Sequence, residues 1–241
     1  SGVLIRGAAK RLRPGLAPKI PDPAVRREHI LRNMLWGLAI TEITAQVARR
    51  SLYCSKDASG ESSNLRMASA DGNIRFVDAK HDLDATGRCR ICGAPSPGEG
   101  ENQESHAYSF IHCAPLPQDF PMKIDIIVSN PPYQLKGGGH GASALPIYQH
   151  FVTQAKGMAK HVVMIIPSRW FAGGRGLDGF RQEMLVDDQM RVLVDHLDPS
   201  DCFPNVTIKG GVCYFYWAQG SSGACRVTTH IGGACEEAMR K

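Results

Sequence analysis

The chain has 241 residues, of which 43% are hydrophobic, 21% charged and 7% aromatic, and its formal net charge is +5. This composition is that of a folded globular protein and excludes disorder, collagen and coiled coil. The longest predominantly apolar runs, Ile124–Val128 and Val162–Ile166, are far shorter than the ~20 residues that span a bilayer. With eight cysteines and no signal peptide, we expect a soluble, cytoplasmic protein with reduced thiols and no membrane partner.

The N-terminal third shows alternating helical and extended patterns. Apolar residues spaced four apart predict a first helix, and four prolines then predict a linker that is not helical throughout. Thr41 is placed to cap a later helix, with Glu42 near its positive end. In chain order we expect a helix at 3–12, a linker at 14–23, a helix at 26–34, a strand at 35–40, a helix from 41, and a strand at 73–77.

The C-terminal half contains strands that are apolar along almost their whole length. Strands of this kind, separated by helices, predict a parallel sheet with buried faces, and therefore an α/β fold. The last two strands are joined without a helix, so we expect that pair to be antiparallel. The strands are expected at 123–129, 162–166, 191–196 and 212–217, and the helices at 146–160 and 177–187.

A tetrapeptide that can bind an amine follows the first of these strands: Asn130, Pro131, Pro132 and Tyr133. The two prolines fix two φ angles and remove two backbone donors, which leaves a stiff loop with carbonyl acceptors. Ligands bind outside the carboxyl ends of the strands in open α/β sheets. The side-chain oxygen of Asn130 and the carbonyl of Pro131 can each accept one N–H of a planar exocyclic amine, and Tyr133 can stack on its ring.

This tetrapeptide resembles the catalytic motif of S-adenosylmethionine-dependent amino-methyltransferases. The blocks Pro167–Gly174 and Asp201–Pro204 resemble DNA adenine-N6 methyltransferases of restriction–modification systems, in particular the methylase part of large type II enzymes. The resemblance covers nearly the whole chain. It implies a Rossmann-like methyltransferase fold, with a mostly parallel sheet and an antiparallel terminal strand, truncated at both ends. Residues 1–241 would then form a partial catalytic domain.

The resemblance also implies a binding site for S-adenosylmethionine. Ser1 and Gly2 match the tail of the family's glycine-rich cofactor turn. The family's ribose-binding acid would align with Ala39, a departure, and Glu42 is the nearest substitute. Asp78 follows a predicted strand and matches the acid near the cofactor's adenine ring.

Phe203 matches the family's second aromatic residue, which contacts the target base after it leaves the helix. Together with Tyr133 it would hold that base, since base–aromatic stacking is worth ~1–3 kcal/mol. The implied partners are double-stranded DNA and a restriction endonuclease domain or subunit.

A metal-ligand pattern lies between residues 84 and 121, where periodicity gives way to glycine, proline and polar residues. Cys89 and Cys92 are followed by His106 and His112, a spacing within the C-x2-C…H-x3–5-H zinc pattern. Cys113 is an alternative fourth ligand. We expect 84–121 to be an insertion stabilised by structural zinc, with unliganded surface Cys and His as the alternative.

The function implied is transfer of a methyl group from S-adenosylmethionine to N6 of adenine in DNA, as part of a restriction–modification system. Two alternatives stay open. One is an amino-methyltransferase that acts on a protein glutamine or on N2 of an rRNA guanine; the other is an inactive nucleic-acid-binding remnant. Because the first cofactor motif is incomplete, we expect this fragment alone to be inactive.

Overall fold

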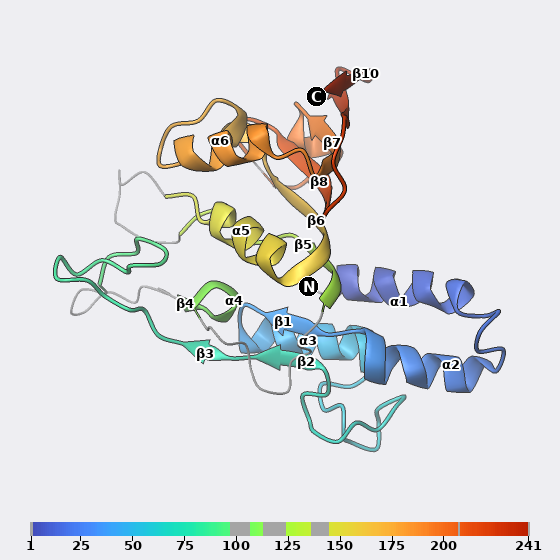
Figure 1. Cartoon of the computed structure of the whole chain (residues 1–241). Helices are drawn as coiled ribbons and strands as arrows, with labels where there is room; N and C mark the ends of the chain where they lie inside the picture. Colours follow the sequence, from blue (N-terminus) through green and yellow to red (C-terminus); the bar gives the residue numbers. More distant parts are fainter. Residues whose placement is uncertain (1, 97–106, 113–123, 136–144, 207, 241) are drawn as a thin grey trace. The chain divides into compact units, whose positions relative to one another are not determined.

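A computed structural model describes residues 2–96, 107–112, 124–135, 145–206 and 208–240 (Figure 1). The chain divides into two compact units, the first built mainly from residues 1–80 and the second mainly from residues 121–241. Within the described ranges, no helix combines the length and hydropathy that a membrane span requires.

The first unit contains three helices around a small parallel sheet. Its elements are α1 (Val3–Gly15), α2 (Pro23–His29), the π-helical turn η1 (Ile30–Met34), β1 (Gly37–Ala39), α3 (Glu42–Tyr53) and β2 (Ile74–Phe76). The linker prediction is wrong at Pro14, which lies in the last turn of α1. A proline there removes a single intrahelical bond, and the helix ends one residue later.

Two helices in this unit begin directly after a residue that caps their N-terminus. The Asp22 carboxylate accepts hydrogen bonds from the N–H groups of Ala24 and Val25 at 2.7 and 2.9 Å, and Pro23 occupies the first turn of α2. Thr41 and Thr44 form a reciprocal capping box at the start of α3, which confirms the predicted cap.

Buried apolar side chains from these helices and from β2 form one core cluster: Ile30, Leu31, Leu35, Ala45, Leu52, Tyr53, Ala58 and Ile74. The Asn73 side-chain amide donates to the carbonyls of Leu31, Arg32 and Leu35 at 2.9–3.1 Å. These bonds satisfy carbonyls at the end of η1 that would otherwise be buried without donors.

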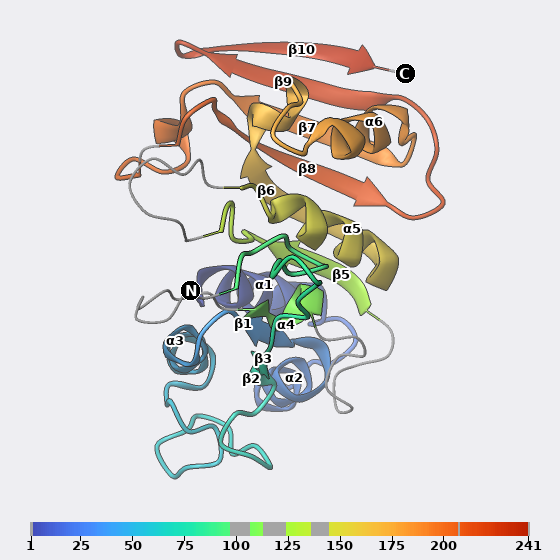
Figure 2. The same cartoon turned by 90° about the vertical axis from the view of Figure 1, so that its left-hand side faces the viewer.

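The second unit is a six-stranded mixed sheet, counted over the described residues, in the order β10-β9-β7-β8-β6-β5. Its strands are β5 (Ile124–Ser129), β6 (Ala159–Pro167), β7 (Met190–His196), β8 (Val212–Ala218), β9 (Cys225–Ile231) and β10 (Ala234–Arg240). The helices α5 (Tyr148–Met158) and α6 (Asp178–Val186) lie on one face of this sheet (Figure 2). The expected α/β fold is confirmed, and the sheet is mostly parallel in the sense that β5, β6, β7 and β9 all run in one direction.

The antiparallel strand of the prediction is β8, but it lies inside the sheet. It pairs antiparallel with both β6 and β7, while β5 pairs parallel with β6. Two further strands follow it. β9 pairs parallel with β7, and β10 returns as an antiparallel hairpin partner of β9.

The remaining elements are short. β3 (Asp78–Ala79) pairs antiparallel with β4 (Ala107–Tyr108), which leads directly into α4 (Ser109–His112). The 3-10 turn η2 (Ser168–Phe171) follows β6, and a second one, η3 (Pro199–Asp201), follows β7.

Candidate active site and His/Cys cluster

The Asn-Pro-Pro-Tyr tetrapeptide starts at the carboxyl end of β5. Ser129, the last residue of β5, pairs in parallel with Met164 of β6. Asn130 is exposed, whereas Pro131 is buried and Pro132 and Tyr133 are half-buried. The amide of Asn130 is therefore accessible from solvent, while the residue that follows it is anchored by packing and by its own ring.

Tyr133 is held by main-chain hydrogen bonds to the stretch that precedes α5. Its carbonyl accepts from the N–H of Ile147 at 3.2 Å, and Gln134 forms an antiparallel bridge with Pro146. The Tyr133 hydroxyl is buried, and among the described residues it has no hydrogen-bond partner. What Tyr133 exposes is therefore ring and backbone rather than its hydroxyl.

The pKa of Tyr133 reflects its burial and two nearby thiols. Burial raises the pKa of Tyr133 above its ordinary value, and the thiols of Cys213 and Cys202 act in the same direction. Cys202 belongs to the Asp201–Pro204 block, which sequence analysis related to base binding. This influence of Cys202 indicates that the fold brings the block into the neighbourhood of Tyr133, about 70 residues away in sequence.

The Asp201–Pro204 block begins with the last residue of η3 and continues as a tight turn. The Asp198 carboxylate accepts from the Ser200 N–H at 2.9 Å, and the Phe203 N–H donates to the Pro199 carbonyl at 2.8 Å. Phe203 itself is half-buried. An aromatic side chain with part of its surface accessible can contact a planar ligand.

The residues expected to bind the cofactor lie in the first unit, around the sheet of β1 and β2. These strands run parallel, with Gly37 opposite Ile74 and Ala39 opposite Phe76. Glu42 follows β1 and Asp78 follows β2, so both carboxylates come after the same edge of the sheet.

Glu42 lies in the first turn of α3, and its carboxylate already accepts hydrogen bonds from neighbouring side chains. Its Oε1 accepts from Arg49 Nη1 at 3.1 Å and from Gln46 Nε2 at 3.4 Å, and 49% of its side chain is exposed. Asp78 is exposed. Both carboxylates are accessible to a ligand.

Gly2 is buried against α3, and a Cβ atom there would come within 2.5 Å of the Ser51 side chain. Only glycine fits this approach without a shift of Ser51. The neighbouring cofactor candidate, Ser1, lies outside the described residues.

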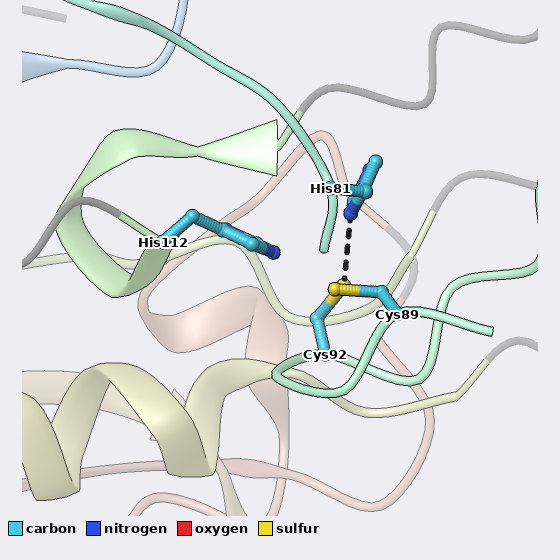
Figure 3. Close-up of side chains that lie close together, drawn as sticks. All are labelled: His81, Cys89, Cys92 and His112. Carbon is cyan, nitrogen blue, oxygen red and sulfur yellow. Dashed lines mark hydrogen bonds between the residues drawn. The ribbon is translucent and has the colours of Figure 1, made fainter. Parts of the chain in front are cut away.

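Four side chains that could hold a metal ion gather next to β3 and α4 (Figure 3): His81, Cys89, Cys92 and His112. Each offers one ligand atom, and these atoms all lie within 4.8 Å of one another. Both thiols are buried, with 3% and 4% of each cysteine exposed. The predicted ligand His106 lies outside the described residues.

Sequence reasoning missed His81. It precedes the Cys-x2-Cys turn, whereas the zinc pattern searches for histidines after it. The pairing of β3 with β4 is the feature that points to His81. It places the residues just after Ala79 next to the segment that leads to His112.

Local hydrogen bonds shape the cluster. Cys92 Sγ lies 3.5 Å from His81 Nδ1, and His112 Nδ1 donates to the Tyr108 carbonyl at 2.9 Å. Burial raises the pKa of the Cys92 thiol to about 11, an N–H of Ala94 opposes this rise, and the Cys89 thiol adds to it.

Known proteins resemble this chain in sequence and fold. The family model described as Eco57I restriction-modification methylase matches residues 33–203. An "Uncharacterized adenine-specific methylase" of Mycoplasma pneumoniae is 31% identical over 258 residues, which cover 95% of this chain and 61% of that protein. The chain therefore spans about three fifths of the length of this relative.

Solved structures also resemble this chain. The "ATP-dependent Type ISP restriction-modification enzyme LlaBIII bound to DNA" gives a TM-score of 0.50 at 12% identity, covering 95% of this chain and 17% of that one. A type I restriction-modification methyltransferase subunit from Streptococcus thermophilus gives a TM-score of 0.38 at 12% identity, covering 52% and 29%.

The strand order, with β8 antiparallel between β6 and β7, and the tetrapeptide after β5 define a protein with the Rossmann-like methyltransferase fold. Because the family model matches more than half of its residues, the chain belongs to the Eco57I restriction-modification methylase family.

Proposed function

We propose that the chain is the catalytic part of a DNA adenine-N6 methyltransferase that uses S-adenosylmethionine and belongs to a restriction–modification system. The observation that carries this proposal is the exposed Asn130 amide at the carboxyl end of β5, followed by a buried proline, in a chain of a restriction-modification methylase family. The adenine-specific name of the Mycoplasma pneumoniae relative supports adenine as the target.

Asn130 and Pro131 act on the amine. Their two carbonyl oxygens accept one N–H each and hold the nitrogen so that its lone pair points away from the loop. The adenine amine is a poor nucleophile because this lone pair is delocalised into the ring. Acceptors fixed in place favour the pyramidal, positively charged nitrogen that forms as the new N–C bond is made, so they stabilise the transition state more than the ground state.

Tyr133 and Phe203 hold the base. An adenine inside duplex DNA is stacked and paired, so it must leave the helix at a cost of a few kcal/mol. Stacking on the Tyr133 ring offsets part of this cost. The burial of the Tyr133 hydroxyl supports this role, because it leaves the ring rather than the hydroxyl for contact with a base.

Gly2, Glu42 and Asp78 bind the cofactor together with Ser1. Their positions fit this role, since two accessible carboxylates follow the same edge of the β1–β2 sheet and can accept hydrogen bonds from ribose hydroxyls and from the adenine amine. When bound, S-adenosylmethionine supplies an electrophilic methyl group, which leaves S-adenosylhomocysteine and, after loss of one proton to water, N6-methyladenine.

The partners follow from the reaction. Double-stranded DNA is the substrate, and a restriction endonuclease domain or subunit is the functional counterpart in the cytoplasm. The names of the similar structures, a restriction-modification enzyme bound to DNA among them, support this pairing.

The experiment is methylation by the full-length protein with tritiated S-adenosylmethionine and a mixture of DNA sequences, followed by digestion to nucleosides and chromatography. We expect label in N6-methyladenine. Asn130→Ala should lose about 10²–10³-fold in rate, the loss typical of removing one transition-state hydrogen bond. Asn33→Ala, a change at an exposed asparagine of η1, is the matched control and should keep full activity.

Other products would contradict the proposal. Label in N2-methylguanine of RNA or in protein glutamine would assign the same tetrapeptide to a different substrate. Full labelling of DNA by Asn130→Ala would remove the role of that residue, and absence of any label would favour a nucleic-acid-binding remnant.

A further inference from the structure

We propose that His81, Cys89, Cys92 and His112 bind one structural Zn²⁺ ion. This inference is independent of methyl transfer, and it replaces His106, the ligand that spacing suggested, by His81. It rests on the donor set, on the distances between the ligand atoms, and on the local structure that orients them.

The distances fit a tetrahedral site. Zn–S bonds of ~2.3 Å and Zn–N bonds of ~2.0–2.1 Å place tetrahedral ligand atoms about 3.3–3.8 Å apart. Cys92 Sγ and His81 Nδ1 are already 3.5 Å apart, and all four ligand atoms lie within 4.8 Å of one another. Contraction by about 1 Å at the widest pair therefore closes the site.

The histidine ligands are oriented as metal ligands usually are. Because a carbonyl can only accept, the 2.9 Å contact between His112 and Tyr108 makes Nδ1 the donor and leaves Nε2 for the metal. Figure 3 shows the His112 ring pointing toward the two sulfur atoms and His81 approaching Cys92 from another side.

The Cys-x2-Cys turn is built like a zinc knuckle. The Cys89 N–H donates to the Ala94 carbonyl at 2.7 Å, and the Gly93 N–H donates to the Cys89 carbonyl at 2.8 Å. Gly93 has φ +71°, in the left-handed region that glycine adopts without strain. The Arg90 N–H closes the loop on the Asp82 carbonyl at 2.9 Å. These bonds fold both sulfur atoms to the same side.

A metal also explains how so polar a loop stays folded. Between residues 80 and 96 the regular pairing is limited to the isolated bridges Leu83↔Cys89 and Arg88↔Pro95. The residues buried there are Cys89, Cys92 and Ala94, which give far too little apolar area for a core. Small segments of this kind are stabilised by a disulfide or a metal. Two thiolates with two imidazoles select zinc over magnesium or calcium, which prefer oxygen.

The first test is metal content. The full-length protein, purified without added metal or chelator, should contain one zinc ion per chain by mass spectrometry. Removal of zinc and titration with Co²⁺ should give the visible absorption of a tetrahedral thiolate site, which added Zn²⁺ abolishes. Chelation should lower the melting temperature and the hydrogen-exchange protection of residues 81–96 and 107–112, and zinc should restore both.

Variants test the ligand set. His81→Asn, Cys89→Ser, Cys92→Ser and His112→Asn should each lose most of the zinc. His106→Asn and Cys113→Ser are the matched controls and should keep it. If a variant does not fold, Co²⁺ titration of the wild-type protein still decides whether the site exists.

Three results would overturn the proposal. A wild-type protein that holds no zinc and gives no Co²⁺ spectrum has no such site. Loss of two titratable thiols without metal would indicate a disulfide. Retention of zinc by His81→Asn with loss in His106→Asn would restore the ligand set suggested by spacing. Failure of methylation would affect none of these measurements, so the two proposals fail separately.

Discussion

The indole N–H of Trp217 donates a 2.9 Å hydrogen bond to the carboxylate of Asp187. The same carboxylate pairs with Lys156, and the Lys156 ammonium lies 5.5 Å from the centre of the Trp217 ring. These three residues come from α5, from the end of α6 and from β8, and only 9% of the Asp187 side chain is exposed. This partly buried carboxylate therefore joins both helices to the sheet that carries the Asn130–Tyr133 loop.

Asp187→Ala should destabilise the protein by about 1–3 kcal/mol, because it leaves the partly buried ammonium of Lys156 and the buried indole N–H of Trp217 without their acceptor. Urea denaturation followed by tryptophan fluorescence measures this change. The matched control is Asp125→Ala, which breaks the exposed pair with Lys160 in the same unit and should leave the unfolding midpoint unchanged. Equal effects of the two substitutions would contradict the structural role of Asp187.

Tyr133→Ala should lower the rate of DNA methylation by about 10–100-fold, since it removes stacking worth ~1–3 kcal/mol. Tyr133→Phe should keep nearly full activity, because the hydroxyl is buried and has no partner among the described residues. Single-turnover methylation of a duplex containing the target site distinguishes the two. A large loss in Tyr133→Phe would show that the hydroxyl, rather than the ring, is needed.

Glu42→Gln should weaken binding of S-adenosylmethionine by about 10–100-fold in the full-length protein, the effect of losing a charge-assisted hydrogen bond. Glu28→Gln removes a carboxylate of α2 that is ion-paired with Arg32 of η1. It should not change the affinity for S-adenosylmethionine. Isothermal titration calorimetry measures the affinity of both variants. An unchanged affinity in Glu42→Gln, with a loss in Asp78→Asn, would place the ribose contact elsewhere.

Cys213 should resist alkylation in the folded protein. Burial raises the pKa of its thiol to about 12, so at pH 8 only about one molecule in 10⁴ carries the reactive thiolate. Because the pKa is raised, reactivity grows only as pH approaches 12 or as the protein unfolds. Cys54 and Cys235 are exposed and serve as internal controls. Mass spectrometry after iodoacetamide treatment should find label there and none at Cys213 unless denaturant is added.

Sequence reasoning predicted well the features that depend on neighbouring residues. The strands after residue 123 and the helices between them were expected within three residues of the observed ends as far as Trp217. Their apolar runs are long and uninterrupted, so the hydrophobic period alone identifies them. The Thr41 cap is equally local, because a capping box involves four consecutive residues.

The hairpin of β9 and β10 was not predicted. All seven residues of β10 are exposed, and glutamate, alanine, methionine and arginine are residues that favour helices, so no strand pattern is visible. A signal was present in Gly232 and Gly233. Both have positive φ, 55° and 85°, as a two-residue type I′ hairpin turn requires.

The sequence by itself determined the stiff loop of Asn130–Tyr133, because its four residues are adjacent and two prolines fix its backbone wherever the chain places it. Only the tertiary structure decided which residues surround it and which histidines meet Cys89 and Cys92. Strand order brings Cys202 into the neighbourhood of Tyr133, and His81 lies with the two thiols after the short strand β3. Such contacts arise from packing of segments far apart in the chain, and spacing along the sequence does not encode them.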